Sequence, residues 1–172
     1  GGDSFQVMVN GGKTEHYETS SSSGAAFMGV IGGKKGFAYT ERLDESAADF
    51  IVKAAAGNAE IAEAGEESVF YSGGEYPELN LYNEELDKIP LREKIEKINL
   101  AEKFALESSE YIKSADRCIY ADDRSRVMIM NTKGLEGEYR ANSMAAFVSV
   151  IGEKDGDIKT RGEFFAGNRF DD

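Results

Sequence analysis

The chain has 172 residues, 41% of them apolar, which is enough to build one or two compact modules around a hydrophobic core. It carries 32 acidic and 20 basic residues, and its net charge of −12 disfavours nucleic acid as a partner because phosphates would be repelled. Its apolar runs, such as residues 25–31, are far shorter than the roughly 20 residues of a membrane-spanning helix, and no secretory signal is visible.

The N-terminal part of the sequence predicts two β-hairpins. Residues 5–19 alternate bulky β-formers and then polar residues around Asn10-Gly11-Gly12, a turn that can adopt positive φ angles. Residues 25–39 repeat this arrangement around Gly32-Gly33. We interpret the four strands as one meander.

An amphipathic helix is predicted to follow, with Asp44 as its N-cap and an end near Gly65. Its apolar stripe is mostly small and comprises Ala47, Phe50, Ile51, Ala54, Ile61 and Ala62. Small side chains permit close packing, so we expect this helix to cover a sheet face that includes Phe27 and Phe37.

Residues 69–89 contain Gly73-Gly74 and Pro77 without sustained periodicity, which indicates a segment crossing between modules. Pro90 suits the first position of a second helix that ends near Ser108. Its apolar face comprises Leu91, Ile95, Ile98, Ala101 and Ala105.

The rest of the chain is predicted to be an antiparallel sheet beneath this second helix. The segments with strand character are residues 116–121, 124–131, 136–152 and 158–168. We therefore expect an α+β fold of two modules, each a mainly antiparallel β-sheet packed with one amphipathic helix. The first module is residues 3–68, the crossing segment residues 69–89, and the second module residues 90–172.

The sequence offers little catalytic chemistry. Its one histidine, His16, lies in a polar strand, and its one cysteine, Cys118, is interpreted as a small core or edge residue. A lone cysteine forms no internal disulfide and fits a reducing compartment, so we expect a cytoplasmic protein. The serine run at residues 20–23 has no histidine base, and residues 32–36 lack the Ser or Thr of a phosphate loop.

The acidic residues do not indicate a site either. Asp155 and Asp157 flank a glycine in a turn too short for a calcium loop. Paired-carboxylate hydrolysis stays open on spacing alone, but no pair is favoured. We predict no catalytic, cofactor-binding or metal-binding residue, and no cofactor.

Three segments nevertheless resemble one family in their order and spacing. They are residues 29–40 followed by Leu43-Asp44 and a helix, residues 77–83 before the second helix, and residues 123–151. Together they resemble the first and middle domains of the PmbA/TldD family, and residues 77–83 look more like its PmbA (TldE) branch.

The resemblance implies a cytosolic metallopeptidase family that processes peptides and carries the older description of modulator of DNA gyrase. In that family a TldD-type subunit holds a histidine-rich zinc site in its C-terminal half, and the TldE branch lacks those ligands and pairs with it. No residue here matches that site. The family's first helix, first strand and C-terminal domain are expected to lie outside these 172 residues.

The function expected first is therefore a non-catalytic portion of a TldE-like subunit, with a TldD-like subunit and peptides as partners. The alternative is a stand-alone peptide- or ligand-binding module, and an independent hydrolase ranks last. We expect no nucleic-acid or membrane partner. An open sheet edge left by the missing N-terminal elements predicts some homodimerisation.

Overall fold

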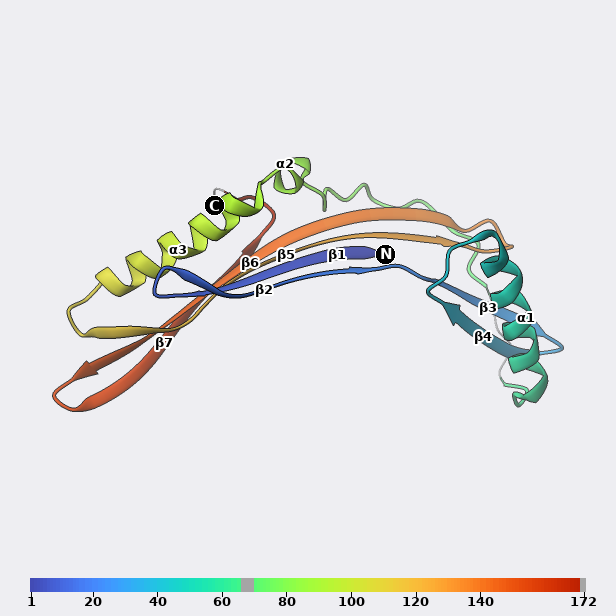
Figure 1. The fold of residues 1–172 in the computed structure, drawn as a ribbon. Helices are drawn as coiled ribbons and strands as arrows, with labels where there is room; N and C mark the ends of the chain where they lie inside the picture. Colours follow the sequence, from blue (N-terminus) through green and yellow to red (C-terminus); the bar gives the residue numbers. More distant parts are fainter. Residues whose placement is uncertain (66–69, 171–172) are drawn as a thin grey trace. The chain divides into compact units, whose positions relative to one another are not determined.

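A computed structural model of the chain describes residues 1–65 and 70–170. Ten helices and strands follow one another along it (Figure 1), and the antiparallel pairings with few helices confirm the predicted α+β class. The residues form two compact units that interleave in the sequence. Unit 1 comprises Gly1, Ser21–Pro77 and Val127–Tyr139, and unit 2 comprises Gly2–Ser20, Glu78–Arg126 and Arg140–Asp172. The expected module boundary at residues 68 and 69 lies outside the described residues.

Unit 2 contains most of a five-stranded sheet in the order β2-β1-β5-β6-β7, and residues 21–22, 127–130 and 136–139 of its strands belong to unit 1. The strands are β1 (Gly2–Asn10), β2 (Lys13–Ser22), β5 (Ile112–Met130), β6 (Glu136–Lys154) and β7 (Asp157–Gly167). β1 pairs antiparallel with β5, with Val7 opposite Tyr120, and β6 pairs antiparallel with β7. The predicted meander of four consecutive strands is wrong, because β1 and β2 join β5 while β3 and β4 pair separately.

β5 is one continuous strand, and the predicted interruption at residues 122 and 123 is also wrong. The Asp122 carboxylate forms an ion pair of 2.6 Å with Lys94 of the helix above it. The Asp123 carboxylate accepts a hydrogen bond of 2.6 Å from Ser143 on β6. Because both acidic side chains have partners on neighbouring elements, the strand accommodates them without a turn.

Helix α3 (Leu91–Glu107) covers one face of this sheet (Figure 1). Pro90 is its N-cap, one residue before the predicted first helical position, and the helix ends next to Ser108 as predicted. The core beneath it consists of Phe5, Val7, Val9, Leu86, Ile98, Cys118, Tyr120 and Met144. Leu91, assigned to the apolar face from the sequence, is 49% exposed. A short helix that the sequence did not indicate, α2 (Glu84–Asp87), precedes α3 and contributes Leu86 to the core.

A buried carboxylate joins α3 to the first hairpin. Glu102 is 2% exposed, and its two oxygens accept hydrogen bonds of 2.8 Å from the backbone N–H groups of Gly11 and Gly12. Both glycines have positive φ angles, which confirms the predicted turn. Two adjacent N–H groups held in this way form a small anion-binding concavity, so the side chain and the turn stabilise each other.

Unit 1 contains the second hairpin, β3 (Ala25–Ile31) and β4 (Lys34–Thr40), and helix α1 (Glu45–Ile61), which covers one face of it (Figure 1). Asp44 caps α1 as predicted. The helix ends at Ile61 rather than near Gly65, since Ala62 is extended and Lys34 satisfies the Glu60 carbonyl.

The face of α1 that packs on the hairpin is made of small residues. Ala47, Ile51, Ala55 and Ala59 are buried, whereas Phe50 and Ile61, included in the predicted stripe, are exposed. Of the two predicted receiving residues, Phe27 lies opposite the buried Ala38 and so on the face that α1 covers, whereas Phe37 lies on the other face. Phe27 is 37% exposed, and Phe37, which alternates with the buried Gly36 and Ala38 and so points away from α1, is 58% exposed.

Gly36 explains why small residues face one another here. A Cβ atom placed on Gly36 would lie 1.8 Å from the carbonyl oxygen of Ala55. The backbones of β4 and α1 therefore approach more closely than any side chain at this position would allow.

Candidate ligand groove

A recess suited to an apolar group lies in unit 2, between the C-terminal half of α3 and strand β7. Its volume is about 470 Å³. The residues that line it are Ala101, Ala105, Ser108, Ile112, Val148, Val150, Gly152, Lys159, Arg161 and Glu163. We call this recess the α3–β7 groove.

Strand pairing explains how the groove is built. In the β6–β7 register, Val148 lies opposite Glu163 and Val150 opposite Arg161, so these side chains share the face that α3 covers. Ala101 and Ala105 leave the space because α3 presents only methyl groups there. The floor is therefore apolar, and the charged wall is contributed by the edge strand.

The charges of the wall have both signs. Arg161 and Glu163 form an ion pair of 2.8 Å, and Lys159 pairs with Asp157 at 2.9 Å. These pairs are largely exposed, so each contributes little to stability and stays free to exchange partners. The groove suits an apolar side chain flanked by polar or charged groups, such as a segment of polypeptide.

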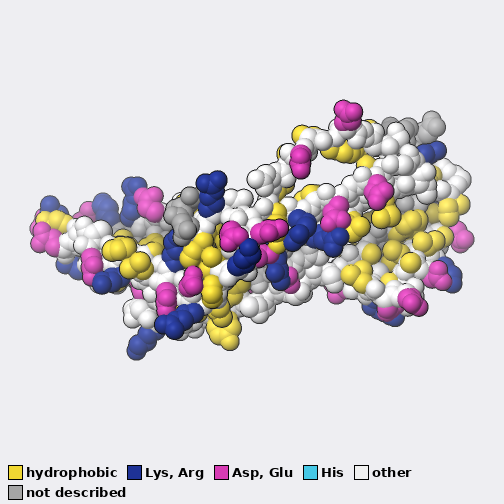
Figure 2. Space-filling model, turned by 90° about the horizontal axis from the view of Figure 1, so that it is seen from above, with side chains coloured by type: hydrophobic (Ala, Val, Ile, Leu, Met, Phe, Trp, Pro, Cys, Tyr) yellow, Lys and Arg dark blue, Asp and Glu magenta, His cyan; other side chains and the backbone are white. Residues whose placement is uncertain are grey.

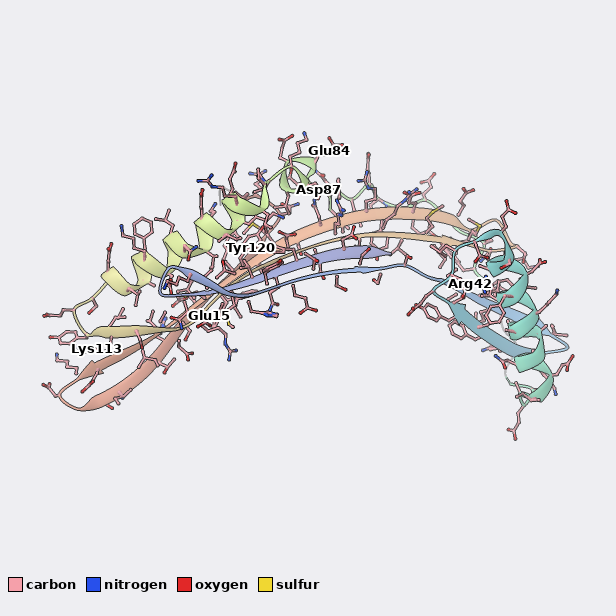
Figure 3. The ribbon with its side chains drawn as sticks, in the orientation of Figure 1. Glu15, Arg42, Glu84, Asp87, Lys113 and Tyr120 are labelled. Carbon is pink, nitrogen blue, oxygen red and sulfur yellow. The ribbon has the colours of Figure 1, made fainter. Side chains whose placement is uncertain are left out.

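A second cluster, on the same unit, ties α2 to the sheet. Asp87, at the end of α2 (Figure 3), accepts hydrogen bonds from the Tyr82 hydroxyl and from Asn142 and lies 3.7 Å from Arg124. The guanidinium of Arg140 stacks 4.0 Å from the centre of the Tyr82 ring. Partial burial opposes ionisation of Asp87, but the hydrogen bonds and the two arginines outweigh it and hold its pKa below the ordinary value.

The Asp87 cluster stabilises the fold and has no group prepared for catalysis. The hydrogen bond to Asp87 raises the pKa of Tyr82, so the phenol stays protonated at neutral pH. Asn142, which is 4% exposed, also holds Asn83 through hydrogen bonds of 2.8 Å in both directions. These polar groups use their hydrogen-bonding capacity on one another, and they fix residues 82–87 to β6.

Replacing Asp87 by asparagine is expected to lower stability at pH 7 by about 1 to 2 kcal/mol. Since the pKa of Asp87 is lowered on folding, its contribution is present above the unfolded pKa and is lost as the pH falls below about 4. Urea unfolding of both proteins at pH 7 and pH 3 measures this. Glu84→Gln, on the same helix and exposed, is the control. A deficit of Asp87→Asn that is equal at both pH values would contradict the assignment.

The residues considered from the sequence are not brought together. His16 is exposed on β2, and Cys118 is fully buried in the core of unit 2. Burial raises the pKa of the Cys118 thiol to about 11, so it is protonated and a poor nucleophile or metal ligand. Among residues 1–65 and 70–170, no three His, Cys, Asp or Glu side chains are grouped to hold a metal ion. These residues do not fit a zinc site.

Charged side chains are mixed on the surface. On the face shown in Figure 2, Lys and Arg alternate with Asp and Glu, and no extended basic area is visible. The described residues contain no helix long and apolar enough to cross a membrane.

Comparisons with known proteins agree on one family. The model of the PmbA/TldA metallopeptidase domain 1 matches residues 1–59, and that of the PmbA/TldA metallopeptidase central domain matches residues 84–172. The chain belongs to the PmbA/TldD family. The α3–β7 groove lies entirely within the PmbA/TldD central domain. No curated protein matches the chain.

Solved structures show the same fold. A proposed modulator of a DNA gyrase from Thermotoga maritima has a TM-score of 0.88 at 20% identity, over 99% of this chain and 38% of that one. TldE from Thermococcus kodakarensis has a TM-score of 0.87 at 17% identity, over 98% and 38%. A proposed modulator of DNA gyrase from Bacteroides thetaiotaomicron has a TM-score of 0.81 at 18% identity, over 99% and 40%. The chain thus spans about two fifths of the length of these PmbA/TldD-like structures.

Proposed function

We propose that this chain is a non-catalytic portion of a TldE-like subunit, which associates with a TldD-type subunit in a cytosolic peptide-processing assembly. The observation that carries the proposal is the pair of family matches, in order, over residues 1–59 and 84–172. The likeness to a TldE structure is consistent with that branch. The buried, protonated thiol of Cys118 and the self-saturated Asp87 cluster fit a role in binding rather than in bond cleavage.

Within this proposal the α3–β7 groove binds an apolar side chain of the partner or of a peptide. Its floor is made of alanine and valine, and its rim offers charges of both signs to the flanking backbone and side chains. Burial of one large apolar side chain contributes about 1.5 to 3 kcal/mol. That is enough to make the groove a dominant contact in a transient interface.

Filling the groove is expected to weaken association. Ala105→Phe places a ring in the recess and should reduce affinity for a TldD-type subunit by about tenfold or more. Leu100→Phe, on an exposed part of the same helix and outside the groove, should leave affinity unchanged. Calorimetric titration with the purified TldD-type subunit measures both. Equal affinities of the two variants would exclude the groove, and absence of any binding by the unmodified chain would exclude the proposed association.

A stand-alone binding module is the second candidate, supported by the size of the groove, which would accept a small molecule. A thermal-shift screen separates the two functions. Stabilisation by a metabolite, without any response to the TldD-type subunit or to peptides, would favour the second.

A further inference from the structure

Strand β7 ends the five-stranded sheet. Within residues 1–65 and 70–170 it pairs with β6 on one side and with no strand on the other. An edge of this kind presents backbone N–H and C=O groups that can pair with another strand. Natural edges are commonly protected by charges, proline or short length. β7 carries charges of both signs, but it is eleven residues long, lacks proline and exposes Ile158 (66%) and Phe164 (67%).

We propose that β7 pairs antiparallel with β7 of a second copy of this chain, with Gly162 on the two-fold axis. In a symmetric dimer with a continuous sheet the axis is perpendicular to the sheet, so each residue faces a residue from the same side of β7. This geometry restricts the pairing to registers centred on a single residue. The proposal does not depend on association with a TldD-type subunit.

Charge and the length of the paired segment together select one register, since a pair centred on Ile158 also matches Asp157 with Lys159 but joins only residues 157–159 of β7. Centring the pair on Arg161 or on Glu163 places that residue opposite its own copy, and centring it on Thr160 places Arg161 opposite Lys159. Centring it on Gly162 places Arg161 of each chain opposite Glu163 of the other, which makes two favourable pairs. The side chains of Arg161 and Glu163 are 83% and 76% exposed, so both can exchange their internal ion pair for the intermolecular one.

The other contacts in this register are also favourable. Lys159 faces Phe165 of the second copy, which permits a cation–π contact. On the opposite side of the sheet Ile158 meets Ala166, and Thr160 meets Phe164, so exposed apolar surface becomes buried.

Gly162 suits the central position. A Cβ atom on Gly162 would lie 2.7 Å from the ring of Phe147 on β6, so this ring covers the glycine from one side. In the dimer the Phe147 ring of each copy would lie close to the two-fold axis. The backbones of the two Gly162 residues would face one another there.

Charge reversal tests the register. Sedimentation equilibrium at about 0.15 M salt, which screens the repulsion between two acidic chains, should show a monomer–dimer equilibrium for the unmodified protein. Arg161→Glu alone should weaken dimerisation by about tenfold or more, since it places like charges opposite each other twice. Arg161→Glu combined with Glu163→Arg should restore it, because the swap recreates both pairs. Arg92→Glu, on the exposed side of α3, is the matched single reversal and should not abolish association.

Cross-linking provides a second readout that does not depend on charge. Residues opposite each other in antiparallel strands have Cα atoms about 4.5 to 5.5 Å apart, within the range of a disulfide. A mixture of Thr160→Cys and Phe164→Cys chains should therefore form mixed disulfide dimers on mild oxidation, whereas Thr160→Cys alone should form few. The native Cys118 is buried and stays unreactive.

A strict monomer at all accessible concentrations would overturn the proposal. A dimer that survives Arg161→Glu without loss of affinity, or that cross-links equally well through Thr160→Cys alone, would overturn it as well. Circular dichroism verifies that each variant is folded.

Discussion

Replacing Gly36 by alanine is expected to destabilise the chain by about 3 kcal/mol or more, at the upper end of overpacking effects. The added Cβ would lie 1.8 Å from the Ala55 carbonyl oxygen and 2.8 Å from the Ala59 nitrogen. These neighbours are helix backbone, so they can retreat only if the whole of α1 moves off the hairpin. The small apolar face that holds α1, including Ile51, would then lose contact with β4.

Urea unfolding followed by circular dichroism measures the loss, and hydrogen exchange of the α1 amides shows where it occurs. Gly57→Ala is the matched control, because a Cβ there meets nothing within 4 Å. In a helix this change should stabilise by about 0.5 to 1 kcal/mol. If Gly36→Ala unfolds with the same free energy as the unmodified chain and its α1 amides exchange no faster, the backbones of β4 and α1 do not approach as closely as described.

Glu102→Ala is expected to cost about 3 kcal/mol. The substitution removes two charge-assisted hydrogen bonds of 2.8 Å and leaves the N–H groups of Gly11 and Gly12 without their acceptor. Glu102→Gln should recover only part of the loss, since an amide offers one oxygen where the carboxylate offers two.

The same unfolding measurement, with Glu107→Ala as control, tests this prediction. Glu107 lies on the same helix, but its side chain is 62% exposed and only loosely paired with Lys103. Its removal should change stability by less than about 0.5 kcal/mol. Equal effects at positions 102 and 107 would mean that the Glu102 carboxylate does not hold the hairpin.

Local features of this fold were predictable from the sequence. Gly11-Gly12 and Gly32-Gly33 marked hairpins because few other residues adopt their positive φ angles. Asp44 marked a helix start through its capping side chain, and Pro90 marked one through its fixed φ angle and missing N–H. Alternation along the strands likewise indicated the sheets.

Pairing between distant segments was not predictable in the same way. Nothing local to residues 5–9 specifies β5 as their partner, so four strands close in sequence were assigned to one meander. Asp122 was read as a turn residue because its partner, Lys94, lies in another element. Nothing in the sequence singled out Glu102, because its acceptor role depends on a hairpin far away in the sequence.

The candidate groove could not be predicted from the sequence either. Its walls are ordinary alanines, valines and strand charges, none of which forms a motif. Only the packing of α3 on β6 and the β6–β7 register place them around one space. The family resemblance, by contrast, was visible in the order of segments, and the domain matches confirm it.

The pairing of β1 with β5 has a consequence for biosynthesis. Phe5, Val7 and Val9 are translated more than a hundred residues before their partners on β5. Long-range contacts of this kind slow folding and leave apolar segments unprotected in the meantime. Until β5 is made, the nascent chain therefore exposes the apolar residues of the β1–β2 hairpin, and chaperone binding during that interval should favour its yield.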